Sequence, residues 1–164
     1  MIDEKQKYCY KCGSQLTIKE DGIDGKTLYC ETCKEFHYPF YNVAVSMIVL
    51  SHDEKNILLI KQYKKDKYIL VAGYVNIGEE PSQTIERELQ EETSLNVKSI
   101  AYNSSHFFKP SNTLMLNYIV IVQNEEVKPN QEIDSYKWFN KEEAKERIAK
   151  NSLAEKFLLE YLNK

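Results

Sequence analysis

Beyond about residue 40, short apolar runs alternate with polar turns, a pattern that predicts several strands and few helices. The run from Val43 to Leu50, interrupted by Ser46, suits a buried strand and is far too short to span a bilayer. Further strands are indicated by runs rich in β-branched and aliphatic residues. Together, the expected strands are 41–51, 56–63, 68–72, 100–108, 113–123 and 136–139.

Two segments have helical periodicity instead. Residues 81–93 begin with Pro81, which suits the first turn of a helix, and Ile85 and Leu89 lie four residues apart on one face. The tail from Lys141 predicts one or two amphipathic helices, which pack through Leu153, Phe157, Leu158 and Tyr161. The pattern favours an α/β fold in which a mixed sheet carries helices on both faces.

Composition and charge narrow the class of protein. The 164 residues leave room for one ordinary domain and a small module. With 22 basic and 25 acidic residues, the net charge of −3 gives no general attraction for nucleic acid. Any phosphate binding must therefore be local and assisted by a metal ion. The N-terminal segment has no apolar core of signal-peptide length, so we expect a cytoplasmic protein.

All four cysteines lie in the first 33 residues, as two C-x2-C pairs that are 17 residues apart: Cys9, Cys12, Cys30 and Cys33. This spacing lets four thiolates surround one tetrahedral ion, which predicts a structural zinc site with no open position. Two disulfides or four free thiols are the alternatives, and a reducing cytosol argues against disulfides. We therefore expect a small zinc ribbon at residues 1–38, followed by the main domain at residues 39–164.

The predicted helix at 81–93 carries an acidic cluster. Glu88, Glu91 and Glu92 are spaced i, i+3 and i+4, so they project from one face within a single turn. Arg87 is the only basic residue of this helix. A solvated acidic surface is the simple interpretation of such a run. A site for a hard divalent cation is the alternative, because such ions need several charged oxygen ligands.

The surrounding segment favours the cation site, because it resembles the signature of the Nudix hydrolase family, G-x5-E-x7-R-E-U-x-E-E-x-G-U, where U is a bulky aliphatic residue. Eight of the nine specified positions match without a gap. Serine at position 94 replaces the family's last glycine, where a left-handed residue is favoured, which should cost about 1 kcal/mol of local stability. The matching residues are Gly73, Glu79, Arg87, Glu88, Leu89, Glu91, Glu92 and Leu95.

The resemblance implies a Nudix α/β/α sandwich and a role for each matching residue. Glu88 and Glu92 are the expected ligands of Mg²⁺ or Mn²⁺, and Glu91 is a further ligand or the base that activates water. The Gly73 carbonyl is another expected ligand. Arg87 is expected to orient the glutamates through a salt bridge, and Glu79 to brace the loop. The catalytic set is therefore Glu88, Glu91, Glu92 and Arg87.

A zinc ribbon directly before such a domain is similar to the NADH pyrophosphatase type of this family. Those enzymes split NADH, NAD or an NAD cap on RNA into mononucleotides, although they usually have an additional N-terminal domain. Glu132 before Trp138 resembles an element of that type, and this likeness makes Glu132 a candidate fourth acidic ligand; a solvated loop glutamate is the alternative. The chain lacks the proline-rich middle of the type's second motif at residues 105–111.

Within this second motif we identify candidate substrate-binding residues. Phe107 or Phe108 can stack on a base or nicotinamide, and Lys109 can meet a phosphate. The alternative is that one phenylalanine belongs to the core and Lys109 to a turn, as ordinary strand alternation allows.

Several functional hypotheses remain open at this level. The leading one is a diphosphohydrolase of NADH, NAD or a related dinucleotide. ADP-ribose, a sugar nucleotide or a nucleoside triphosphate are alternative substrates. A nucleotide-sensing regulatory protein is an alternative of another class, against which the intact glutamates argue. The mixed charge of the ribbon is a poor footprint for RNA beyond a capped end. The family resemblance also implies a homodimer.

Overall fold

The computed structural model describes residues 6–22 and 25–164. It divides the chain into two compact units, Met1–Tyr41 and Asn42–Lys164. In the first unit, strands β1 (Thr17–Glu20), β2 (Lys26–Cys30) and β3 (Glu35–His37) form an antiparallel sheet. The second unit holds the larger sheet and all helices of the described part of the chain.

The sheet of the second unit has the strand order β7-β8-β4-β5-β9, and β6 also pairs with β4. The β4–β8 pair is parallel and the other pairs are antiparallel, so the sheet is mixed, as the sequence predicted. Its strands are β4 (Asn42–Leu50), β5 (Asn56–Gln62), β6 (Val71–Tyr74), β7 (Val97–Phe108), β8 (Thr113–Val122) and β9 (Ile133–Asn140).

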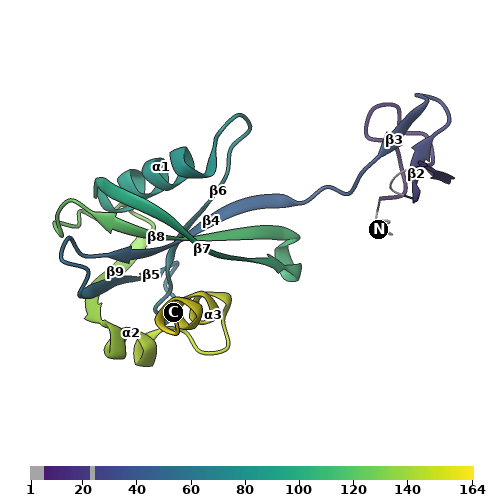
Figure 1. Cartoon of the computed structure of the whole chain (residues 1–164). Coiled ribbons are helices and arrows are strands. Elements are labelled where there is room, and N and C mark those ends of the chain that lie inside the picture. Colours follow the sequence, from purple (N-terminus) through teal and green to yellow (C-terminus); the bar gives the residue numbers. More distant parts are fainter. Residues whose placement is uncertain (1–5, 23–24) are drawn as a thin grey trace. The chain divides into compact units, whose positions relative to one another are not determined.

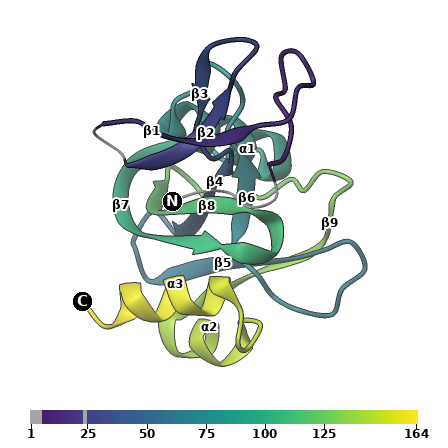
Figure 2. The same ribbon diagram turned by 90° about the vertical axis from the view of Figure 1, so that its right-hand side faces the viewer.

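Helices cover both faces of this sheet. Helix α1 (Pro81–Thr93) lies on one side, and α2 (Lys141–Arg147) and α3 (Leu153–Leu162) lie on the other in both views (Figure 1 and Figure 2). Strand alternation divides the core accordingly. Met47 of β4 packs in the cluster that contains Ile85 and Leu89 of α1, whereas its neighbour Ile48 packs with Phe157 and Leu158 of α3. The expected α/β/α sandwich is therefore confirmed.

Helix α1 has the predicted bounds, and local sequence explains both ends. Pro81 occupies the first turn, and the side chain of Gln83 accepts a hydrogen bond from the Glu80 backbone N–H at 2.8 Å. The helix ends at Ser94, whose φ of 59° is left-handed and whose N–H donates to the Gln90 carbonyl at 3.0 Å. The family's glycine position is thus a left-handed C-terminal cap in this chain as well.

Three strands, β6, β7 and β9, begin three residues away from the predicted position; β7 starts at Val97, not at Ile100. Strand β6 covers Val71–Tyr74, and Tyr68 and Ile69 form only isolated bridges with other segments. Strand β9 begins at Ile133, three residues before the predicted start, because β5 supplies its partners as far as Gln62. The early start of β7 follows from its pairing with β8, because Val97 lies opposite Val122. No helix in the described ranges is both long and apolar enough to cross a membrane.

Candidate active site

A pocket of about 620 Å³ in the second unit brings together residues from distant parts of the chain. Its acidic residues are the three candidate glutamates of α1 and Glu132, which precedes β9. Gly73 of β6 belongs to the same lining. The larger uncharged side chains at this pocket are Tyr63, Tyr74, Phe108, Met115 and Leu153. None of the residues that line the pocket carries a positive charge.

The three glutamates of α1 differ in burial although they share one helix face. Glu91 keeps 58% of its side chain exposed, Glu88 keeps 15%, and Glu92 is buried. Burial, together with the nearby charge of Glu88, raises the pKa of Glu92 to about 7. The side-chain amide of Gln62 opposes this shift, since its Nε2 donates to Glu92 Oε2 at 3.1 Å. The protonated and ionised forms of Glu92 therefore coexist near pH 7, and a neighbouring cation would favour the ionised form.

Arg87 links the glutamates to the preceding loop. Its Nε and Nη2 donate to the two oxygens of Glu79 at 2.6 and 2.9 Å, a bidentate pair. Its Nη1 donates to Glu88 at 2.7 Å and to Glu91 at 3.2 Å, and Nη2 also reaches the Tyr74 carbonyl at 3.1 Å. One guanidinium thus fixes the loop and two carboxylates of the cluster.

Glu79 braces the loop between β6 and α1. Arg87, with the backbone N–H of Asn76 and the hydroxyl of Thr84, lowers the pKa of Glu79 to about 2. The Asn76 N–H donates at 3.1 Å and the Thr84 hydroxyl at 2.9 Å. The carboxylate is consequently ionised across the whole ordinary pH range, and it ties the start of α1 to the loop.

At Gly73 the backbone of β6 lies against the Glu88 side chain of α1. A Cβ at this position would lie 2.0 Å from Cδ of Glu88, which is far inside contact distance. Gly73 is also held from the other side, because it pairs with Val45 of β4. Only a residue without a side chain lets the Glu88 carboxylate lie against the β6 backbone.

Glu132 lines the same pocket from the loop that precedes β9. The Tyr63 hydroxyl donates to Glu132 Oε2 at 3.1 Å, and this hydrogen bond raises the pKa of Tyr63. The backbone N–H of Glu132 donates to the Asn130 side chain at 2.9 Å. Sequence reasoning missed Tyr63, for which hydrophobic periodicity gives no signal.

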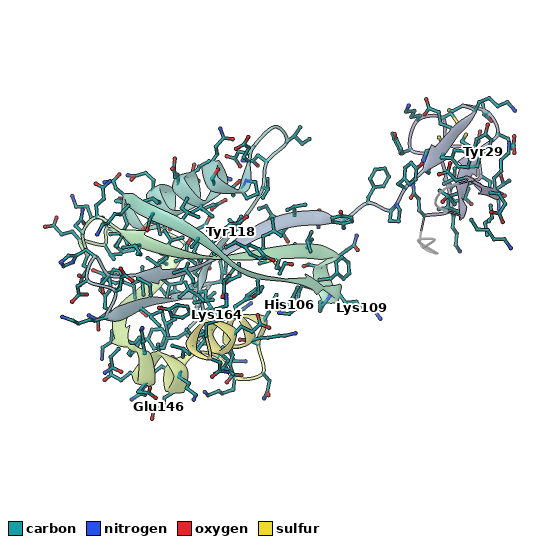
Figure 3. The ribbon with its side chains drawn as sticks, in the orientation of Figure 1. Tyr29, His106, Lys109, Tyr118, Glu146 and Lys164 are labelled. Carbon is teal, nitrogen blue, oxygen red and sulfur yellow. The ribbon has the colours of Figure 1, made fainter. Side chains whose placement is uncertain are left out.

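Of the candidate substrate-binding residues, Phe108 lines the pocket, whereas Phe107 and Lys109 are not among its lining residues. Side chains of consecutive strand residues point to opposite faces, which explains the difference between the two phenylalanines. Lys109 lies at the tip of the β7–β8 hairpin (Figure 3). Met115 was not predicted; the parallel β4–β8 register places it opposite Ala44, another lining residue.

The chemistry of the pocket fits a hard divalent cation. Its charged donors are carboxylate oxygens only, and the Gly73 backbone adds a carbonyl within the same lining. Mg²⁺ and Mn²⁺ prefer such oxygen ligands. The buried Glu92, with its raised pKa, is the carboxylate that gains most from a neighbouring positive charge. Glu88, Glu91, Glu92, Glu132 and Gly73 are therefore the residues that can hold the ion.

The cysteines form a second cluster, within the first unit. Their sulfur atoms all lie within 4.8 Å of one another, and all four are free thiols. The Sγ atoms of Cys9 and Cys33 are 3.9 Å apart, and those of Cys12 and Cys30 are 3.5 Å apart. A zinc ion with bonds of about 2.3 Å to a tetrahedron of sulfurs requires edges of about 3.8 Å. The geometry therefore fits zinc.

Neighbouring groups already distribute the protons of this cluster unevenly. Hydrogen bonding with Ser14 lowers the pKa of the Cys12 thiol to about 6, and hydrogen bonding with Cys12 raises that of Cys33 to about 12. In addition, His37 Nε2 lies 3.5 Å from the buried Cys9 sulfur. Thiolate is the form that binds zinc, so all four cysteines would lose their protons when the ion binds.

Comparison with proteins of known sequence identifies relatives of the chain. The chain is 30% identical over 129 residues to a protein of Photobacterium profundum named NAD-capped RNA hydrolase NudC, covering 77% of this chain and 47% of that one. It is 29% identical over 151 residues to Nudix hydrolase 19, chloroplastic, of Arabidopsis thaliana, covering 87% and 34%. The chain thus spans about half or less of the length of these relatives.

Solved structures show the same fold. A NUDIX hydrolase from Nitrosomonas europaea superposes with a TM-score of 0.70 at 22% identity, covering 96% of this chain and 90% of that one. The NUDIX domain of Shewanella oneidensis NrtR, solved with ADP ribose, gives a TM-score of 0.63 at 14% identity, covering 82% and 92%. Residues 40–161 match the NUDIX domain family. With the signature helix and its loop in place, the chain belongs to the Nudix family.

Proposed function

We propose that the chain is a divalent-cation-dependent pyrophosphohydrolase that acts on NADH, NAD or a related dinucleotide and releases a nucleoside monophosphate. The observation that carries this proposal is the convergence of Glu88, Glu91, Glu92 and Glu132 with Gly73 on one pocket. The substrate class is supported by similar bacterial proteins, several of which are named NAD-capped RNA hydrolases.

In this proposal Glu88 and Glu92 bind Mg²⁺ or Mn²⁺ together with the Gly73 carbonyl, and Glu132 is a further ligand. When bound, the ion polarises the phosphoryl oxygens and lowers the pKa of a coordinated water. Glu91, the most exposed of the three pocket glutamates of α1, serves as another ligand or as the base that accepts a proton from the attacking water. Arg87 keeps Glu88 and Glu91 in place throughout.

The aromatic lining residues of the pocket give the proposed binding surface for the rest of the substrate. Phe108 and Tyr74 line the pocket with aromatic rings that are 38% and 55% exposed, which suits stacking on a base or nicotinamide. We place Phe107 and Lys109 at the outer end of this surface, where Lys109 meets a phosphate or a capped RNA end. The carboxylates themselves repel a diphosphate, so substrate binding requires the cation.

We further propose that residues 1–38 are a structural zinc ribbon and that residues 39–164 are the catalytic domain. Four thiolates fill the coordination shell of zinc and leave no open position for chemistry. A reducing cytoplasm would keep these cysteines available to the metal. The protein is proposed to act as a homodimer.

The test is turnover of a substrate panel. The purified chain is incubated with Mn²⁺ or Mg²⁺ and with NADH, NAD, ADP-ribose, nucleoside triphosphates or NAD-capped RNA, and products are identified by mass spectrometry. We expect NADH to give AMP and reduced nicotinamide mononucleotide faster than the other compounds react. Preferred cleavage of another compound would discard the dinucleotide assignment, and no turnover of any compound would favour a nucleotide sensor.

Variants of α1 link turnover to the pocket. Glu88→Gln and Glu92→Gln should abolish turnover while circular dichroism shows an intact fold. Glu86→Gln is the matched control, because Glu86 lies on the same helix and is exposed outside the pocket. Retained activity in both pocket variants would contradict the proposed ligands.

A further inference from the structure

Two consecutive residues at the end of β5 contact two different carboxylates of the pocket. The Gln62 amide donates to Glu92 of α1, and the Tyr63 hydroxyl donates to Glu132 of the loop before β9, each at 3.1 Å. Glu92 and Glu132 are 40 residues apart in the sequence and belong to different elements. The end of β5 therefore connects the two acidic walls of the pocket.

The backbone at this point is unusual. Tyr63 and Lys64 both have left-handed φ values, 55° and 57°, which residues with a Cβ rarely adopt. Such strain persists only where surrounding contacts hold it, and it concentrates at functional sites. Here the pairing of β5 with β9 shifts register after Lys61 and skips Asp134, whose carboxylate accepts a hydrogen bond from the Lys64 N–H. The turn is thus fastened to the start of β9.

The left-handed conformation decides where the Tyr63 side chain goes. In a regular strand, Gln62 and Tyr63 would point to opposite faces of the sheet. In this structure both side chains contact carboxylates of the pocket: the buried Gln62 donates to Glu92 from outside the lining, and the exposed Tyr63 is itself a lining residue. The strained turn therefore brings two consecutive side chains to carboxylates of the same pocket, which a regular strand would not do.

Glu132 needs such a partner. It is an exposed residue in a loop, where a glutamate side chain has many accessible rotamers. The Tyr63 hydroxyl engages Oε2, and the other oxygen, Oε1, has no hydrogen bond within the described part of the chain. A single donor thus restricts the side chain and leaves one oxygen for another ligand.

We propose that Tyr63 is a positioning residue whose hydroxyl holds Glu132 beside Glu92, so that the loop carboxylate and the α1 carboxylates bind one divalent cation. This inference rests on the proposed function, because it requires that these glutamates bind the cation. Outer hydrogen-bond partners of metal ligands raise metal affinity by orienting the ligand. Tyr63 supplies that orientation without itself contacting the ion.

The test measures Mn²⁺ binding directly, by electron paramagnetic resonance titration of the full chain without substrate. Tyr63→Phe removes only the hydroxyl, and we expect it to weaken Mn²⁺ binding by roughly three- to tenfold, because this hydrogen bond is exposed to solvent and therefore contributes less than a buried bond to a charged group. Glu132→Gln should weaken binding at least as much. The double variant should be no weaker than Glu132→Gln alone, because both changes remove one interaction.

Tyr136→Phe is the matched control. Its hydroxyl also donates one hydrogen bond, to the Val127 carbonyl at 3.2 Å, but Tyr136 lies outside the pocket lining. We expect this variant to bind Mn²⁺ like the unaltered chain. Equal weakening in Tyr136→Phe and Tyr63→Phe would show a general loss of structure and overturn the positioning role.

A kinetic readout separates positioning from substrate contact. Saturating Mn²⁺ should restore the kcat of Tyr63→Phe, because the lost property is cation affinity, and KM for the substrate should stay unchanged because the ring remains. If Tyr63→Phe binds Mn²⁺ as tightly as the unaltered chain does, while Glu92→Gln binds it clearly more weakly, only the positioning role of Tyr63 is overturned. A chain that binds no Mn²⁺ even at millimolar concentration would overturn the proposed function as well.

Discussion

Gly73 and Glu88 occupy space that no side chain at position 73 could share, since a Cβ there would lie 2.0 Å from the Glu88 carboxyl carbon. Gly73→Ala should therefore displace Glu88 and lower both Mn²⁺ affinity and turnover by at least tenfold. The substitution should also destabilise the fold, by about 1–3 kcal/mol, as overpacking does. Thermal unfolding and steady-state turnover measure the two effects.

A double-mutant cycle identifies the cause of that loss. Glu88→Ala removes the side chain that clashes, so adding Gly73→Ala to this variant should cost much less stability than it costs the unaltered chain. Equal costs in both backgrounds would show that Gly73→Ala acts through some contact other than Glu88.

The substitution Glu92→Gln is expected to have opposite effects on stability and on activity. Its folded pKa, about 7, lies above its ordinary value of 4.5, so the fold favours the protonated carboxyl. Stability without added divalent cation should therefore fall as pH rises from about 4.5 through 7. Glu92→Gln removes this penalty and should be more stable at pH 8, by up to about 3 kcal/mol at about 1.4 kcal/mol per pKa unit, with the gain vanishing below pH 4.5.

The measurement for Glu92→Gln is the midpoint of chemical unfolding between pH 4 and pH 8. Glu91→Gln is the control, because Glu91 is mostly exposed, and it should change stability little across this range. A Glu92→Gln variant that is less stable than the unaltered chain at pH 8 would contradict the buried charge as the source of the penalty.

Glu79 should show the reverse dependence on pH. Arg87 holds the folded pKa of Glu79 at about 2, below the ordinary 4.5, so the ionised carboxylate contributes stability that is fully present above about pH 4.5. Glu79→Gln should lower the melting temperature at pH 7, and the difference should shrink as pH falls from 4.5 towards 2. Glu86→Gln, an exposed change on the same helix, should show no such trend.

Ser94 offers a test of backbone strain. Its φ of 59° is left-handed, so Ser94→Gly should stabilise the chain by about 0.5–1 kcal/mol, as measured by thermal unfolding. Ser94→Ala is the control, because it removes the 3.4 Å hydroxyl contact with the Lys128 carbonyl and keeps the strain. A gain of the same size in both variants would assign the effect to the hydroxyl instead.

Chelation tests the cysteine cluster. The purified chain should contain a single zinc ion, and its removal should unfold the unit Met1–Tyr41 while Asn42–Lys164 keeps its structure, because the first unit has few buried apolar side chains in its described part. Elemental analysis and limited proteolysis measure the two effects. Cys12→Ser should lose zinc and Thr32→Ala should retain it; zinc-free protein with an intact first unit would contradict the site.

The sequence predicted the parts of the site that are local in the chain. Helical spacing alone places Glu88 and Glu92 on one face, and the match to the family signature adds Gly73 and Glu79. Spacing could not separate Glu91 from Glu92, although one is exposed and the other buried. Burial depends on what packs against the helix.

The remainder of the site depends on contacts between distant segments. Met115 enters the pocket through the parallel register of β8 with β4, and Leu153 through the position of α3. Tyr63 lines the pocket because its backbone is left-handed, and the sequence has no glycine or asparagine at this turn that would predict such a conformation. Strand periodicity assigns faces within one strand, but it does not determine which strands become neighbours.

The wide spacing of the acidic residues has a thermodynamic consequence. Gly73, Glu88 and Glu132 converge only in the folded chain, so an ion that needs all of them has no comparable site on the unfolded chain. By mass action, an ion present at about 100 times its dissociation constant would add about 2.7 kcal/mol to the free energy of unfolding. The supply of divalent cation in the cell would then change the unfolded fraction of this protein by up to about 100-fold, as well as the rate at which the protein works.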